Sequence, residues 1–428
     1  MIWARSSRLG SAPVLALSAA LAAIPATRAR AAEPRSAIDL DHMVPHGDHW
    51  VAPLATGGDV QLTLDPELQQ AALKILASAN PVRGGMIVID AHTGQVLAWA
   101  ETARDGHHHQ TLTTARMPAA SVFKLVTTAA LFETTTLSPH DEVCIAGGMH
   151  DIERRHLDAP RGEGVECSPF AYAIGFSKNA VFAQLATHRL LRSSLIDTAH
   201  ALGFNGHVPF ELDVPVGALE VPYGDLEFAR TAAGFQGSTL SPLGAAYLAS
   251  VIAHGGEATR IRVTAPDSAD SDEPAEIVER VLKPRTADRI RRMMEVTVRS
   301  GTCRHAFSDE SGHRYLGNIR VSGKTGTLRP EASESARDPR KGEGMTSWFM
   351  GFAPSQKPEI IVSVMLENGS VWRHKANELA RDLLRNYFHG HGRPWVSDPL
   401  GAPAAERVAT TQPAGAVSAT AARDRDTR

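Results

Sequence analysis

The chain has 428 residues, a length that fits one large domain or two or three of average size. Its apolar content of 43% is enough for a substantial core, and its net charge of −3 comes from 44 basic and 47 acidic residues. No run of basic residues indicates a nucleic-acid partner and no segment repeats, so we expect no binding to nucleic acid.

The first 31 residues have the pattern of an export signal. Arg5 and Arg8 form a positively charged N-terminal region, and Ser11–Ile24 is an apolar stretch. Ala29-Arg30-Ala31 matches a small-x-small cleavage site. The apolar stretch is shorter than the about 20 residues that a membrane-spanning helix needs. We therefore predict a signal peptide over residues 1–31, with an uncleaved membrane anchor as the alternative. In both cases the body of the protein lies outside the cytoplasm.

Residues 32–58 contain Pro, His and Asp without sustained periodicity, which predicts a linker. A helix is expected next, because Asp65 and Pro66 are typical of an N-cap and a first helical position. Apolar residues then recur on one face of that helix: Leu68, Ala71, Ala72, Ile75 and Leu76. Two apolar runs, 86–89 and 96–99, flank a turn-forming stretch and predict a β-hairpin.

A long apolar helix is expected after Pro118, with Ser121 and Lys124 near its start. Residues i and i+3 share one helix face, so the amine would lie beside the hydroxyl. A serine hydroxyl becomes a good nucleophile when a base removes its proton. The apolar neighbours of Lys124 would bury it and favour its neutral form, which can act as that base. Taken alone, the motif would favour an ordinary exposed pair.

Three cysteines lie in the chain. In an oxidising compartment Cys144 and Cys167 can form a disulfide, which leaves Cys303 unpaired. Three free thiols are the alternative.

Two further motifs follow the serine–lysine pair along the chain. Ser177-Lys178-Asn179 combines a hydroxyl with an amide, although alone it also fits a polar loop. Lys324-Thr325-Gly326-Thr327 ends an apolar strand expected over residues 319–327, and its glycine would let a ligand approach the strand edge. A solvated edge strand is the alternative for this motif alone. Together with the serine–lysine pair, the motifs indicate acyl transfer on a substrate that ends in a carboxylate.

Regular elements are also expected around and after these motifs. Ser241-Pro242 opens a helix that Gly255-Gly256 ends. Apolar runs predict strands over residues 347–354 and 360–366, and a closing helix follows with one apolar face: Ala376, Leu379, Ala380, Leu383, Leu384 and Tyr387. The first hairpin and the last three strands are therefore expected to share one sheet. The composition of residues 393–428 predicts a disordered tail.

The histidines suggest a metal site at first sight. His107-His108-His109 and the pair His389 and His391 lie in polar or Gly-rich stretches. Neither group has Cys or carboxylates at the spacing of a metal site. We therefore expect no metal and no other cofactor.

The order S-x-x-K, S-x-N, K-T-G resembles that of the penicillin-binding proteins and serine β-lactamases. Ser121 is the only serine with a lysine three residues later, and K-T-G occurs once. The family often has P-G-S at the first motif, whereas this chain has Pro118-Ala119-Ala120-Ser121. The resemblance implies a transpeptidase domain over residues 59–392. Its fold would be α+β, with a mainly antiparallel sheet, helices on both faces and a largely helical subdomain.

The resemblance also implies roles in catalysis. Ser121 would be the nucleophile and Lys124 its base, and Ser177 would relay a proton between Lys124 and the leaving amine. The backbone N–H groups of Ser121 and Thr327 would form the oxyanion hole, which is often the largest single contribution to such catalysis.

A second group of residues would bind the substrate. By resemblance, Asn179 donates a hydrogen bond to the substrate's backbone carbonyl. Lys324 and the hydroxyls of Thr325 and Thr327 would hold the terminal carboxylate, next to Gly326.

The implied function is that of a peptidoglycan D,D-transpeptidase or D,D-carboxypeptidase, acting through an acyl-serine on D-Ala-D-Ala stem peptides. Its partners would be these peptides and β-lactam antibiotics, with a membrane only if the N-terminal segment stays uncleaved. The location would be the periplasm or the outer face of the bacterial inner membrane. A serine β-lactamase is an alternative, although Asn179 departs from the S-x-V of the oxacillin-hydrolysing class. A non-catalytic penicillin-binding sensor is the other alternative, against which the intact motifs argue.

Overall fold

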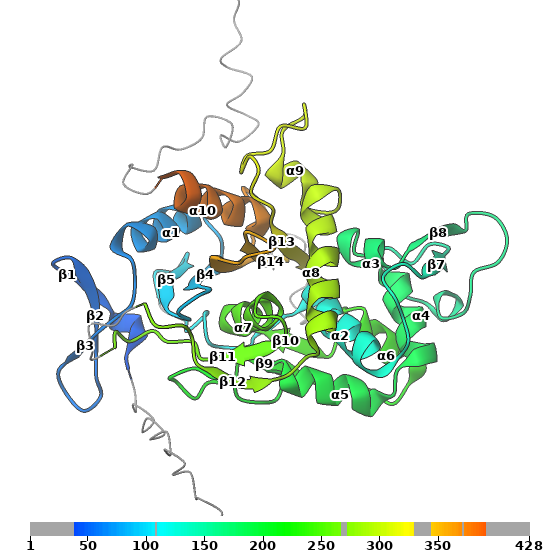
Figure 1. Cartoon of the computed structure of the whole chain (residues 1–428), viewed down its shortest axis with the longest axis horizontal. Helices are drawn as coiled ribbons and strands as arrows, with labels where there is room; N and C mark the ends of the chain where they lie inside the picture. Colours follow the sequence, from blue (N-terminus) through cyan, green and yellow to red (C-terminus); the bar gives the residue numbers. More distant parts are fainter. Residues whose placement is uncertain (1–37, 108, 267–271, 329–343, 370–371, 391–428) are drawn as a thin grey trace, which may run out of the picture. The chain divides into compact units, whose positions relative to one another are not determined.

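The structure, a computed structural model, is described over these residues: 38–107, 109–266, 272–328, 344–369 and 372–390. Its centre is a five-stranded antiparallel sheet in the order β13-β14-β15-β4-β5 (Figure 1). The strands are β4 (Arg83–Asp90), β5 (Val96–Ala103), β13 (Ser322–Leu328), β14 (Thr346–Ala353) and β15 (Ile360–Glu367). The predicted hairpin and the last three strands therefore do share one sheet.

Helices cover both faces of this sheet, which confirms the predicted fold class. Helices α1 (Pro66–Ser78) and α10 (Ala376–Gly390) contact one face, and α7 (Pro242–Ala253) and α8 (Pro284–Arg299) contact the other. Successive residues of a strand point to opposite faces. Met86 and Val88 accordingly belong to the core under α1 and α10, whereas Ile87 and Ile89 belong to the core under α7. Burial on both faces explains why residues 86–89 of β4 are all apolar.

The helix starts follow from local chemistry. The Asp65 carboxylate accepts a hydrogen bond of 2.8 Å from the backbone N–H of Leu68, and Pro66 occupies the first helical position of α1. In the same way, Ser241 Oγ accepts a bond of 3.1 Å from the N–H of Gly244 at the start of α7. Both N-caps were predicted from the sequence.

A largely helical subdomain lies beside the sheet, on the right of Figure 1. Its helices are α2 (Lys124–Thr134), α3 (Ala171–Gly175), α4 (Asn179–Arg189), α5 (Arg192–Ala201) and α6 (Asp225–Ala232). The remaining helices are α9 (Arg304–Phe307) and the 3-10 turns η1 (Leu40–His42), η2 (Ala120–Val122) and η3 (Arg154–His156).

Ten short strands form smaller sheets around these elements. They are β1 (Val44–His46), β2 (His49–Pro53), β3 (Asp59–Gln61), β6 (Met117–Pro118), β7 (Glu142–Ile145), β8 (Glu166–Pro169), β9 (Gly217–Leu219), β10 (Ser238–Leu240), β11 (Glu257–Thr259) and β12 (Ile277–Arg280). Cys144 and Cys167 face each other in the β7–β8 pair and form a disulfide, while Cys303 is free and buried. Of the two sequence alternatives, the structure thus has the paired one.

The predicted linker over residues 32–58 is wrong from residue 38 onward. This part carries η1, β1 and β2, and Trp50 is 6% exposed within the main core cluster. The strands are too short for a visible alternation of apolar residues, so only burial of Ile38, Leu40 and Trp50 against the domain reveals them.

The predicted signal or anchor (1–31) and tail (393–428) lie outside the described residues, as do 32–37. Among the described helices, none has the length and apolarity needed to cross a bilayer.

Candidate active site

Ser121 lies in a tight turn between β6 and α2. The α-helix begins at Lys124, and the serine belongs to the 3-10 turn η2 that precedes it. This corrects the expectation of one helix through both residues. The reason is Ala120, whose φ of 50° lies in the left-handed region and interrupts helical geometry just before the serine.

Ala120 is the residue at which the sequence departs from the expected P-G-S pattern. Left-handed backbone costs an alanine about 1–2 kcal/mol, so neighbouring groups must hold the turn. Trp348 Nε1 donates a hydrogen bond of 2.9 Å to the carbonyl of Pro118. On the other side, Gly234 approaches so closely that a Cβ there would lie 2.1 Å from the Ala120 carbonyl oxygen. The departure from P-G-S therefore leaves a glycine-like turn in place.

Ser121 and Lys124 form the first half of the site. Lys124 Nζ donates a hydrogen bond of 2.6 Å to Ser121 Oγ. The lysine is fully buried, and its ammonium lies 5.8 Å from the centre of the Phe182 ring. Burial holds the pKa of Lys124 well below its usual range, and the charge of Lys324 lowers it further. A neutral amine beside the hydroxyl is what a general base requires.

Lys324 forms the second half. This residue is also fully buried, on β13, and its Nζ donates bonds of 3.2 Å to Ser177 Oγ and 2.8 Å to the carbonyl of Thr325. Burial lowers the pKa of Lys324 to about 7, so both protonation states are populated near neutral pH. Burial also raises the pKa of the neighbouring Cys303 thiol to about 12, which leaves that thiol uncharged.

The turn of Ser177-Lys178-Asn179 links α3 to α4. Ser177 has a φ of 54°, which turns the chain sharply between the two helices. Lys178 Nζ donates a bond of 3.2 Å to Ser168 Oγ, and the Asn179 side-chain amide donates a short bond to the carbonyl of Met149. Within the described residues, Ser177 thus contacts Lys324, and the predicted relay contact with Lys124 is not among the hydrogen bonds.

The K-T-G-T motif lies on β13, an edge strand of the five-stranded sheet, next to the serine turn. A Cβ on Gly326 would lie 3.3 Å from the Ala120 Cβ, so β13 and η2 are in close contact. Thr325 Oγ1 shares a hydrogen bond of 2.6 Å with Thr302 Oγ1, and Thr327 is exposed near the strand end. The structure therefore brings the three predicted motifs to one place.

Sequence reasoning missed four residues that position these motifs. Gly234 and Trp348 hold the serine turn, Met149 holds Asn179, and Thr302 holds Thr325. These residues lie far along the chain from the motif residues, so no sequence spacing links them to the motifs. The one local signal is Gly234 with Gly237, both at positive φ, three residues apart just before β10.

The described residues give little support for a metal centre. Glu142, Cys144 and Cys167 are the one group whose donor atoms lie close enough, but both of its sulfurs are in the disulfide. His109 bonds Asp105 at 2.8 Å, and His108 and His391 lie outside the described residues. A cavity of about 1010 Å³ is lined by β7, η3 and α4, and neither Ser121 nor Lys124 lines it. The site assignment therefore rests on the chemistry of the motif residues.

We expect Gly234→Ala to disrupt the serine turn. The new Cβ would overlap the Ala120 carbonyl and displace Ser121 from Lys124. A displacement of about 1 Å lowers the rate of a positioned reaction on the order of 100-fold. Reaction of Ser121 with a labelled β-lactam measures this. Gly255→Ala is the matched control, since Gly255 also has positive φ but meets no atom within 4 Å. Equal effects of the two substitutions would contradict the positioning role of Gly234.

Comparison with known proteins agrees with this geometry. The family model "Penicillin binding protein transpeptidase domain" matches residues 84–386. The peptidoglycan D,D-transpeptidase PbpA of Mycobacterium tuberculosis H37Rv is 25% identical over 352 residues, which cover 73% of this chain and 68% of the relative. PbpA of Mycolicibacterium smegmatis is 26% identical over 358 residues, covering 73% and 68%.

Solved structures resemble the fold. Penicillin-binding protein A from M. tuberculosis, as its ceftriaxone acyl-enzyme, has a TM-score of 0.60 at 22% identity and covers 78% of this chain and 80% of its own. Penicillin-binding protein 3 from M. tuberculosis with aztreonam has a TM-score of 0.62 at 20% identity, with coverage of 82% and 84%. Because the family model spans most of the chain and all three motifs, the chain belongs to the penicillin-binding protein transpeptidase family.

Proposed function

We propose that this protein is a serine D,D-transpeptidase of peptidoglycan, or a D,D-carboxypeptidase with the same first step. The observation that carries the proposal is the bond of 2.6 Å between Ser121 Oγ and the fully buried amine of Lys124. The names of the PbpA relatives support the transpeptidase reaction. All functional residues named below are part of this proposal.

The first step adds Ser121 Oγ to the substrate and forms a tetrahedral intermediate, whose collapse in the second step gives the acyl-enzyme. Neutral Lys124 takes the proton of Ser121 while Oγ attacks the penultimate D-Ala carbonyl of a stem peptide. Negative charge develops on the carbonyl oxygen, which the backbone N–H groups of Ser121 and Thr327 stabilise. Asn179 donates to a backbone carbonyl of the substrate. Its amide has two N–H groups, and the bond to Met149 fixes one of them and so orients the other.

The second step releases terminal D-Ala. The C–N bond breaks as the leaving amine receives the proton held by Lys124, and Ser177 lies on the route as a relay. The terminal carboxylate binds Lys324, with the hydroxyls of Thr325 and Thr327 beside Gly326. A bound carboxylate favours the charged form of Lys324, whose pKa of about 7 leaves that form only partly populated beforehand. An amine of a second stem peptide, or water, then takes the acyl group from Ser121.

The proposed setting is outside the cytoplasm. The Cys144–Cys167 disulfide supports an oxidising compartment, and the signal-like residues 1–31 support export. Stem peptides and β-lactams are the proposed partners, in the periplasm or on the outer face of the inner membrane. We propose no metal, no cofactor and no nucleic-acid partner.

Labelled penicillin tests the proposal against its two alternatives. We expect one equivalent of label that persists for hours and maps to Ser121 by peptide analysis. Ser121→Ala should remove the label, because Ser121 is the nucleophile of the proposed mechanism. Rapid loss of label would instead indicate a β-lactamase, and absence of label a non-catalytic module. Label that remains in Ser121→Ala would contradict the nucleophile.

We expect acylation to depend on neutral Lys124. The rate should fall as the pH drops through the lowered pKa of this lysine, since protonation removes the base. Lys124→Arg keeps the charge but cannot act as a base. Acylation by penicillin should therefore slow by about 100-fold or more, the usual contribution of general base catalysis. A rate within about threefold of the unsubstituted protein would be incompatible with this role.

The variant Lys324→Ala tests whether Lys324 binds the carboxylate of the ligand or acts only by lowering the pKa of Lys124. Losing a charge-assisted hydrogen bond costs about 1.5–3 kcal/mol, so acylation by β-lactams with a free carboxylate should slow roughly 10- to 150-fold. The corresponding esters should be affected less. Loss of the neighbouring charge should also raise the pKa of Lys124 and move the acidic limb of the pH profile to higher pH. Equal slowing of acid and ester would mean that Lys324 acts through Lys124 alone.

A further inference from the structure

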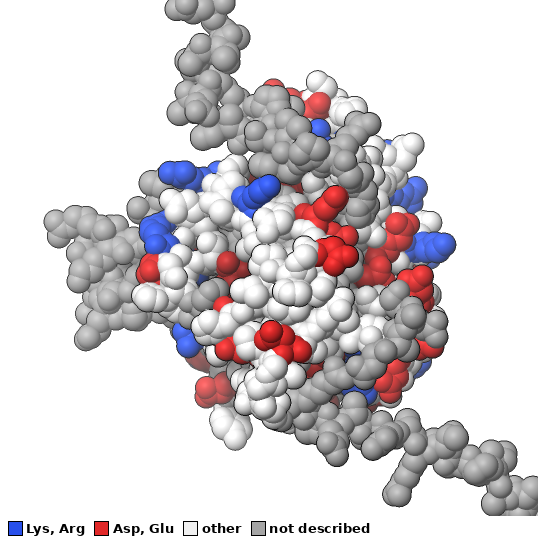
Figure 2. All heavy atoms as spheres, turned by 90° about the vertical axis from the view of Figure 1, so that its left-hand side faces the viewer, with Lys and Arg blue, Asp and Glu red and all other residues white. Residues whose placement is uncertain are grey.

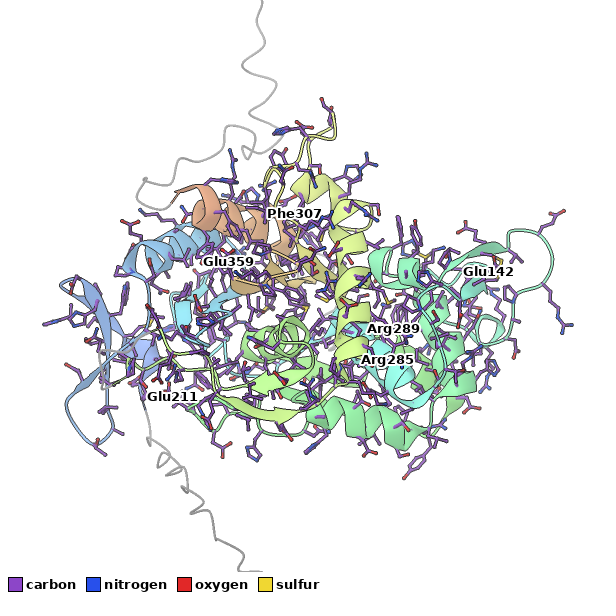
Figure 3. All side chains as sticks on the ribbon, in the orientation of Figure 1. Glu142, Glu211, Arg285, Arg289, Phe307 and Glu359 are labelled. Carbon is purple, nitrogen blue, oxygen red and sulfur yellow. A yellow bond between two sulfur atoms is a disulfide. The ribbon has the colours of Figure 1, made fainter. Side chains whose placement is uncertain are left out.

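A second cavity lies next to the turn formed by residues 300–303, which bonds the loop that carries Ser177-Lys178-Asn179 (the catalytic loop). It has a volume of about 470 Å³ and is bounded by the end of α8, by α9 and by the loop that leads into β13. Its apolar lining includes Val298, Phe307 and Leu316, which are 8%, 4% and 3% exposed. Phe307, labelled in Figure 3, is the last residue of α9, and its ring stacks on Phe349 with 5.7 Å between the ring centres. Buried apolar side chains thus form one side of the cavity, and the volume of the cavity is one that small ligands occupy.

Four arginines line the same cavity: Arg299, Arg304, Arg314 and Arg320. All four are exposed, so their guanidinium groups can move to meet a ligand. On the face shown in Figure 2, by contrast, basic and acidic side chains are interspersed. Gathering like charges around a hollow raises the local positive potential and attracts anions.

The residues that line the cavity include these four arginines and one carboxylate. Glu295 is the acidic side chain of the lining, and it already pairs with Arg291 at 2.6 Å and accepts a bond from Ser355. Arg320 approaches Glu295 only to 4.0 Å. Across the described parts of the chain, Arg299 and Arg304 form no ion pair or side-chain hydrogen bond. The partial negative charge at the C-terminus of α8 favours a cation at Arg299, the last residue of that helix. It does not explain Arg304, which lies beyond α8.

We propose that this cavity is a ligand site for a small amphiphilic carboxylate. The carboxylate would bind between Arg299 and Arg304, for which planar guanidinium groups are well suited. The apolar part would cover Phe307, Leu316 and Val298. Two sources share this chemistry: a fatty acid and an N-acylated peptide with a free C-terminus.

The site is connected to the catalytic loop by one turn. Between Arg299 and Arg304, the backbone N–H of Thr302 donates a bond of 3.0 Å to the carbonyl of Gly175, two residues before Ser177. Gly301 lies so close that a Cβ there would be 2.0 Å from the same carbonyl oxygen. The Thr302 hydroxyl bonds Thr325. A ligand that orders this turn is therefore expected to change the rate of acylation at Ser121, a consequence that rests on the proposed function.

Binding is tested with 8-anilinonaphthalene-1-sulfonate, an apolar ring system with one anionic group, on the full chain. We expect a saturable fluorescence titration in the unsubstituted protein. The double substitution Arg299→Ala, Arg304→Ala should weaken binding roughly tenfold or more, through loss of charge-assisted hydrogen bonds. Arg292→Ala is the matched control, because Arg292 lies on α8 with its side chain 71% exposed but does not line the cavity. It should bind as the unsubstituted protein does.

Competition then identifies the ligand. Decanoate and N-acetyl-D-alanyl-D-alanine are compared with their methyl esters as displacing agents, and only the free acids should displace the probe. The acid that displaces at the lower concentration indicates the source. Three results would overturn the site: no saturable binding, unchanged binding in the double variant, or equal loss in Arg292→Ala. Displacement by the esters as well would overturn its carboxylate specificity.

The effect on catalysis is measured separately, as the rate of penicillin acylation with and without saturating decanoate. A change of twofold or more that disappears in the double variant supports the connection through Thr302. An unchanged rate, with binding intact, would overturn that connection but not the binding site. Because probe binding does not require Ser121 to react, failure of the proposed function and failure of this site give different results.

Discussion

The burial of two amines at one place is the constraint on which this structure depends. Lys124 and Lys324 are both fully buried, and no acidic side chain of the described residues forms an ion pair with either. A charged group without a partner is expensive to bury, so the pKa of each amine falls. The fold supplies hydroxyl and carbonyl oxygens instead, from Ser121, Ser177 and Thr325. The result is an amine that can be neutral beside a nucleophile.

Holding these groups together requires tight backbone contacts between the sheet and the helical subdomain. Ala120 and Ser177, each next to or within a motif, both have positive φ. Such conformations cost about 1–3 kcal/mol each and persist only where the surroundings hold them. Gly234 against Ala120 and Gly301 against Gly175 are contacts of this kind, in which a side chain larger than hydrogen does not fit. The free energy that the two strained conformations cost is offset by the packing contacts that hold them.

The same turn serves two surfaces. The backbone N–H of Thr302 bonds the carbonyl of Gly175, and Ser300 of the same turn lines the arginine-lined cavity. In our proposal, a ligand in this cavity acts on Ser121 through these bonded groups.

The sequence by itself determined the motif residues, the caps of α1 and α7 and the strands of the central sheet, because these signals are local in the chain. It could not determine the β1–β2 region, since Trp50 is ordered only by packing against residues distant in sequence. Nor could it find Gly234, Met149 or Thr302, whose partners lie far away along the chain. Tertiary structure alone decided these contacts and the burial that lowers the pKa of Lys324, because they depend on residues brought together from distant parts of the chain. The burial of Lys124 was expected from its apolar neighbours, and the structure chose the Cys144–Cys167 pair from the two alternatives that the sequence left open.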